Sequence, residues 1–135
     1  MHFSSRHRKQ ARRGAAVVEL AVCLPLIALL VFASLEGANM LFLRQAVVQS
    51  AYEAAKVAAR ADGSQARAQR LANDILASRN INPSRISFSP GNVDSLDAGT
   101  VFTVTVSAAG DQKSITTIGP FNGLNIEAQA TMHKE

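Results

Sequence analysis

The chain has 135 residues, of which 47% are hydrophobic and 5% aromatic, and its formal net charge is +4. This length corresponds to one domain of ordinary size. The single cysteine, Cys23, excludes an intrachain disulfide and a cysteine-rich metal site. The three histidines lie near the ends of the chain, so a conventional triad or zinc site is not expected. We therefore predict no enzyme, no cofactor and no metal.

Positive charge is concentrated before residue 14. This head contains no acidic residue, and its basic residues are Arg6, Arg8, Lys9, Arg12 and Arg13. Without them, nine basic residues face ten acidic ones, so the positive net charge belongs to the head. A nucleic-acid-binding protein carries its positive charge on a folded face, whereas this charge borders an apolar segment. The head therefore indicates membrane orientation, and no nucleic-acid partner is expected.

The apolar segment covers residues 14–35, and Glu19 is its only charged residue. As a helix it would be about 33 Å long, enough to cross the hydrocarbon core of a bilayer. Apolar residues resume at 40–43, so we predict a transmembrane helix over residues 15–43. The positive-inside rule keeps the head in the cytoplasm and places the rest of the chain outside it. This predicts a single-pass protein of the cytoplasmic (inner) membrane; a buried core helix is the alternative.

Two kinds of N-terminal processing fit this segment poorly. An ordinary secretory signal would be cut near residues 31–33, but the apolar run is longer than the usual apolar region of such a signal. A lipoprotein signal would use Leu20 to Cys23, yet the apolar run follows Cys23 instead of preceding it. Cys23 is therefore interpreted as a small apolar residue of the helix.

A third kind of processing fits better. Gly14 is followed by four small or apolar residues and then by Glu19, directly after the basic head. This pattern resembles the class III signal of type IV pilins and pseudopilins. The resemblance implies that a prepilin peptidase cuts between Gly14 and Ala15, removes residues 1–14 as a leader and leaves Glu19 as the fifth residue. Glycine suits a cleavage site because it lets the peptidase approach the backbone closely.

Glu19 has two interpretations. A carboxylate in a membrane segment costs about 2.5–3.5 kcal/mol at the bilayer centre and less near its edge. It can lie at headgroup level, solvated or paired with Arg12 or Arg13. Alternatively, the resemblance implies that the new amine of Ala15 reaches the Glu19 carboxylate of a neighbouring subunit in a filament. Such a pair would fix the axial register of the subunits.

Further motifs extend this similarity over about a third of the chain. The region from residue 13 to about residue 60 resembles the TadE family of the tight-adherence (Tad) pilus and secretion system. The motifs that carry the resemblance are Gly14, Glu19-Leu20, Leu24-Pro25-Leu26, Glu36-Gly37, Arg44-Gln45-Ala46 and the alanine-rich helix that ends at Arg60. Ala38-Asn39 and Ala55 depart from the family pattern. The resemblance implies a minor pilin or pseudopilin with other pilin subunits and Tad assembly proteins as partners; the alternative is an uncleaved anchor with a partner-binding outer domain.

Residues 44–135 are predicted to form an extracytoplasmic domain that begins with two helices. Polar residues recur at helical spacing at Gln45, Gln49, Glu53, Lys56 and Arg60. Asp62-Gly63 is a stop signal, and Ser64 can cap a second helix. The apolar positions of that second helix follow an amphipathic stripe: Ala68, Leu71, Ala72, Ile75 and Leu76.

The period of the apolar residues changes to two after Pro83. Alternation predicts strands around residues 86–88, 102–106 and 124–132, and a further strand near residues 113–118. With the helices as cover, these strands predict an α+β fold with a small antiparallel sheet of three or four strands. Asp94 and Asp97 lack the spacing of a calcium loop and indicate a solvated turn. His133 is expected to be exposed and without a partner.

Overall fold

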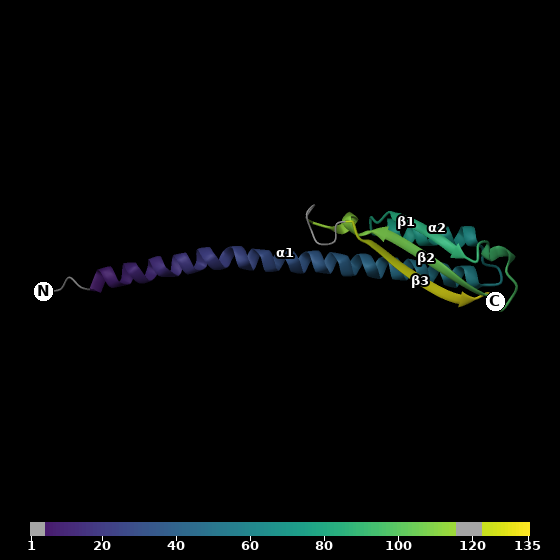
Figure 1. Cartoon of the computed structure of the whole chain (residues 1–135), viewed down its shortest axis with the longest axis horizontal. Coiled ribbons are helices and arrows are strands. Elements are labelled where there is room, and N and C mark those ends of the chain that lie inside the picture. The colour runs from purple at the N-terminus through teal and green to yellow at the C-terminus, as the bar shows by residue number, and fades with distance from the viewer. Residues whose placement is uncertain (1–4, 116–122) are drawn as a thin grey trace. The chain divides into compact units, whose positions relative to one another are not determined.

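A computed structural model describes residues 5–115 and 123–135, and for residues 5–13 it describes the backbone alone. Two helices, α1 (Ser5–Ala59) and α2 (Gln65–Ala77), precede three strands, β1 (Pro83–Ser89), β2 (Val101–Ala109) and β3 (Asn125–His133). Two 3-10 turns, η1 (Val93–Ser95) and η2 (Gly110–Lys113), flank β2. Figure 1 labels the helices and strands in this order. The predicted α+β fold is confirmed.

The chain divides into two compact units, Met1–Leu35 and Glu36–Glu135. The first contains the N-terminal part of α1, and the second contains the remainder of α1 with all the other elements. The second unit thus begins upstream of residue 44, where the sequence places the start of the outer domain. The predicted bounds of the leader, the span and the outer domain stay predictions.

The sheet of the second unit is antiparallel, with the order β1-β2-β3. Alternation along the strands places one apolar set on the inner face, and Val104 of β2 pairs with Phe88 on one side and Ala130 on the other. The inner residues of the central strand β2 are fully or almost fully buried: Phe102, Val104, Val106 and Ala108. Those of the edge strands are partly buried and pack against the same core.

The core joins this face of the sheet to α1 and α2. The helical contribution is dominated by small side chains, which let the backbones approach closely. On α1 the buried residues include Leu43, Ala46, Val47, Ala51, Ala54, Ala55 and Ala58, and on α2 they are Ala68, Ala72 and Leu76. Val48, an apolar residue next to these on α1, is exposed.

One local prediction needs correction. The proposed strand near residues 113–118 is not formed at its start, because Lys113 ends the turn η2; residues 116–118 lie outside the described residues. The described sheet has three strands. Helix α2 ends at Ala77, and Pro83 begins strand β1. A proline is tolerated at the first residue of an edge strand.

Candidate functional site

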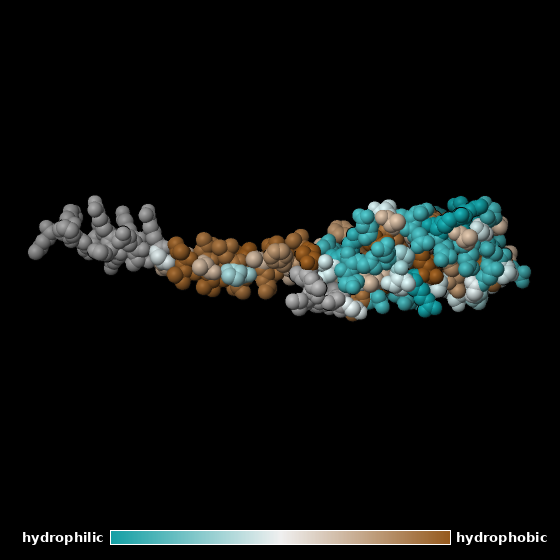
Figure 2. Space-filling model, turned by 90° about the horizontal axis from the view of Figure 1, so that it is seen from above, coloured by the Kyte–Doolittle hydropathy of each residue, from teal (hydrophilic) through white to brown (hydrophobic). Residues whose placement is uncertain are grey.

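The predicted processing and assembly residues lie on a fully exposed part of α1. Every residue from 14 to 35 is exposed, including large apolar side chains such as Leu29 at 65%. The most apolar window of this helix has a mean hydropathy of 2.7, so by length and composition the helix can cross a membrane. Figure 2 shows its hydrophobic surface as a brown stretch beside the grey N-terminal residues. Such a surface requires a cover of lipid or protein.

Gly14 occupies a helical position without any packing constraint. A Cβ atom added there would meet no atom within 4 Å. Glycine inside a helix is destabilising by about 0.5–1 kcal/mol relative to alanine. The contacts described for Gly14 therefore do not require a glycine at this position.

Ala15 and Glu19 lie four residues apart in α1 and so on the same face of the helix. The Glu19 side chain is exposed. Among the residues whose side chains are described, none forms a hydrogen bond or ion pair with it. Five basic residues of the head also lie on α1: Arg6, Arg8, Lys9, Arg12 and Arg13. The pairing of Glu19 with Arg12 or Arg13 stays a prediction.

A second glutamate on α1 has the opposite environment. Glu36 is 5% exposed. Its Oε1 accepts a hydrogen bond from the Ser114 hydroxyl, and its Oε2 accepts one of 2.8 Å from the backbone N–H of Ile115. Hydrogen bonds to a carboxylate are stronger than those between neutral groups. Glu36 thus tethers the residues after η2 to α1. The sequence identified Glu36 only as part of a family motif and did not indicate this role.

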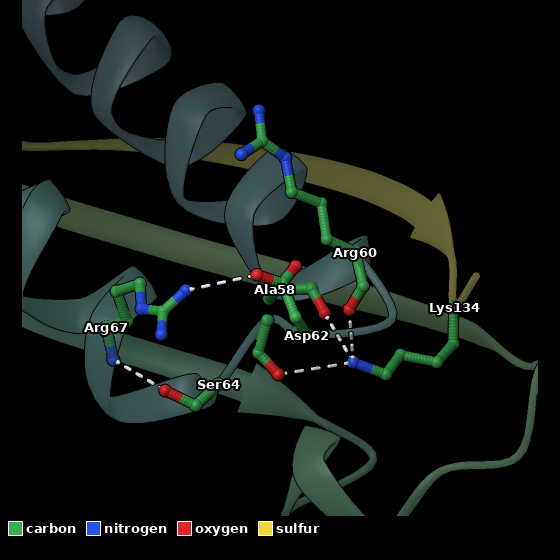
Figure 3. A network of polar contacts seen from close by, with 7 residues as sticks. Ala58, Arg60, Asp62, Ser64, Arg67 and Lys134 are labelled. Carbon is green, nitrogen blue, oxygen red and sulfur yellow. Dashed lines mark hydrogen bonds and ion pairs between the residues drawn. The ribbon is translucent and has the colours of Figure 1, made fainter.

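The C-terminal end of α1 is held by a residue that the sequence analysis missed. Lys134 is buried, and its Nζ donates hydrogen bonds of 2.9 Å to the carbonyl oxygens of Ala58 and Arg60 (Figure 3). A cation at this position also complements the helix dipole. The backbone N–H of Glu135 donates to the Ala59 carbonyl at 2.7 Å. No local sequence pattern predicts this contact, because Lys134 lies more than 70 residues after the end of the helix.

Gly63 is required at the turn that follows. Its N–H donates to the Arg60 carbonyl at 2.9 Å, and an added Cβ atom would overlap the carbonyl oxygen of Val57. Ser64 then caps α2 as predicted, since its hydroxyl oxygen accepts a 3.2 Å hydrogen bond from the Arg67 N–H (Figure 3). The stop signal and the cap therefore have a defined structural basis.

Asp94 and His133 have structural contacts. The Asp94 carboxylate accepts a 2.6 Å hydrogen bond from the backbone N–H of Gln65, at the start of α2, where the helix dipole favours an anion. No group of three His, Cys, Asp or Glu residues among the described residues could hold a metal ion. His133 is exposed, as predicted, but its Nδ1 lies 3.4 Å from the carbonyl oxygen of Gly99, a partner that the sequence did not indicate.

Comparison with known proteins identifies one family. Residues 14–56 match the family described as TadE-like protein, which confirms the resemblance drawn from the sequence. The match begins at Gly14, includes Glu19 and Glu36, and ends in the alanine-rich part of α1. It indicates a pseudopilin-like component associated with a Tad pilus, hence with a membrane and with other pilus proteins. No curated protein and no solved structure matches the chain.

Proposed function

We propose that this TadE-like chain is a minor pilin or pseudopilin of a Tad-type pilus or secretion assembly. A prepilin peptidase cuts it after Gly14, and its single span holds it in the cytoplasmic membrane with residues 44–135 outside. The observation that carries the proposal is the exposed apolar helix of residues 14–35, which bears one acid and follows a basic head. The TadE-like match covers this whole segment.

Cleavage has a chemical consequence for assembly. It creates a cationic amine at Ala15, one helical turn before Glu19. In a filament the amine of one subunit pairs with the Glu19 carboxylate of its neighbour, so that both charges are neutralised within the apolar surroundings. Removing one partner of a buried charge pair costs about 3–5 kcal/mol, which makes a misaligned subunit unfavourable. The role of this protein is structural, and we propose no catalytic activity for it.

The decisive experiment is an intact mass and an N-terminal sequence of the protein extracted from its native membrane. We expect a mature chain that starts at Ala15. A start at Met1, in cells with an active prepilin peptidase, would leave an uncleaved anchor whose outer domain binds a partner. A start near Ser34 would indicate an ordinary secreted domain, and Glu19 would then have no role in assembly.

A matched glycine control tests the cleavage site. Gly14→Val should abolish processing, because a branched side chain blocks the close approach of the peptidase to the backbone. Gly37→Val is the control, since Gly37 is also a glycine of α1 with no atom within 4 Å of an added Cβ. Normal processing of the Gly14→Val variant would contradict the assignment.

Assembly is tested separately from cleavage. Glu19→Ala should allow processing but prevent incorporation into the pilus or its assembly complex, measured by crosslinking and co-purification with the other pilus subunits. Val18→Ala, a truncation at an adjacent exposed apolar position, is the control and should incorporate normally. Equal incorporation of the two variants would favour the simple anchor.

A further inference from the structure

A groove of the second unit combines basic and apolar side chains close to the end of the predicted span. It has a volume of about 470 Å³, within the range of roughly 300–1,000 Å³ that is usual for small-ligand sites. The residues that define its chemistry are Asn39 and Phe42 of α1, Arg79 after α2, and Lys113 at the end of η2. Three separate segments of the chain thus contribute to one concave surface.

The groove has a positive charge that its described lining residues do not neutralise. Arg79 and Lys113 contribute two cations, and none of the described residues that line the groove is acidic. Among the described residues, neither cation lies within ion-pair distance of a carboxylate. Arg79 is instead held by a neutral partner, because its Nη2 donates a 2.6 Å hydrogen bond to Oε1 of Gln49. A guanidinium held this way keeps further N–H donors for a phosphate, which it can bind in bidentate geometry.

The apolar part of the groove matches a lipid better than a free phosphate. Phe42 is 65% exposed although it is aromatic, and it lies on the same groove as the two cations. Phe42 can therefore contact the glycerol and acyl region of a lipid whose phosphodiester binds Arg79 and Lys113.

The chain length keeps this groove near the membrane. Asn39 comes four positions after Leu35, the end of the apolar segment, and both residues lie on α1, so the helix rises about 6 Å between them. The headgroup layer on each side of the hydrocarbon core is about 5–7 Å thick. Asn39 therefore lies at about headgroup level when Leu35 lies at the edge of the hydrocarbon core.

We propose that this groove binds the phosphodiester headgroup of an anionic phospholipid and so fixes the outer domain to the membrane surface. The inference rests on the proposed membrane anchoring, which positions the groove. Before assembly, such a bound lipid would limit the motion of the outer domain about the end of its span.

The test uses the full chain in mild-detergent micelles, with binding of phosphatidylglycerol and phosphatidylcholine measured by native mass spectrometry. We expect a preference for phosphatidylglycerol. The double variant Arg79→Gln/Lys113→Gln should bind it roughly 25-fold more weakly, at about fivefold for each cation. The matched control is Arg70→Gln/Arg85→Gln, which removes two exposed cations that do not line the groove and should keep the preference.

Three outcomes would overturn the proposal: no preference for the anionic lipid, an equal loss in the control, or equally tight binding of soluble glycerol 3-phosphate. The last would indicate a site for a free phosphate compound. Circular dichroism of both double variants verifies that they are folded. Retention of the chain in membranes after carbonate extraction tests the anchoring separately, so a retained chain without lipid preference refutes only the lipid site.

Discussion

Helix α1 contains two apolar stretches with opposite surroundings, one on each side of Glu36. Residues 14–35 carry large aliphatic side chains around the whole helix, and all are exposed within the chain. Residues 37–59 carry mainly small residues on one face, and these are buried against α2 and the sheet. The second stretch of α1 is thus covered by other parts of the same chain. The first stretch has no such cover within the described residues, and its apolar surface calls for lipid or other subunits.

The difference lies in side-chain size and distribution more than in hydrophobicity. A helix that is apolar on all sides fits an apolar solvent or a helical assembly. A narrow alanine face lets a sheet and a second helix approach closely, while the opposite polar face remains in water. Substitutions of the same chemical type should therefore act on folding in the second stretch and leave folding unchanged in the first.

The largest expected effect concerns leucine truncation. Leu43 is fully buried and Leu29 is 65% exposed, although both lie on α1. Leu43→Ala should lower the free energy of unfolding of the second unit by about 2–5 kcal/mol, because it leaves a cavity. Leu29→Ala should change it by less than about 0.5 kcal/mol. Urea unfolding in micelles, followed by the fluorescence of Tyr52, the only tyrosine, measures both values. Equal losses would show that the two stretches are not distinct.

The two glutamates provide the next test. Glu36→Ala removes the acceptor of two hydrogen bonds and should cost about 1.5–3 kcal/mol of stability. Glu19→Ala removes an exposed side chain and should leave the unfolding midpoint of the second unit unchanged, while it prevents assembly. Thermal unfolding and the crosslinking assay separate the two effects. A stability loss for Glu19→Ala similar to that of Glu36→Ala would contradict the division of roles.

Enlarging an alanine tests the close packing of the second stretch. Ala54 is fully buried, so Ala54→Leu should overpack the core and destabilise the second unit by about 1–3 kcal/mol. Ala28→Leu, at an exposed position of the first stretch, should be neutral for folding. The urea unfolding midpoints of the two variants measure this difference. An unchanged midpoint for Ala54→Leu would mean that the small side chains of the alanine face do not limit how closely the sheet approaches α1.

The smallest effect is expected at the end of the second stretch. Lys134→Met keeps much of the apolar stem but removes the ammonium group from the carbonyls of Ala58 and Arg60. This should cost about 1–2 kcal/mol, the upper range for a charge at a helix terminus. Lys56→Met, at an exposed lysine in the last turn of the same helix, is the control. Amide hydrogen exchange of the last turn of α1 should increase for Lys134→Met and stay constant for the control.

Local patterns in the chain predicted most of the fold. The helical spacing of the apolar residues identified α2 together with its Ser64 cap, and alternation identified the three described strands. These signals are readable because each depends on residues that are close in sequence. The interpretation of residues 113–118 as a strand failed at Lys113, since a short apolar alternation does not distinguish a strand from a turn beside the sheet.

The residues of the candidate site also fall into two groups: those that local patterns predicted and those that only the tertiary structure revealed. Gly14, Ala15, Glu19 and the basic head form a contiguous linear signal, so the sequence alone determined the predicted site and its chemistry. Only the tertiary structure decided that Glu36 holds the residues after η2, that Lys134 caps α1, and that Arg79 and Lys113 share a groove. These contacts join residues far apart in the chain, and their geometry depends on how the helices and the sheet pack. Local spacing carries no information about such packing.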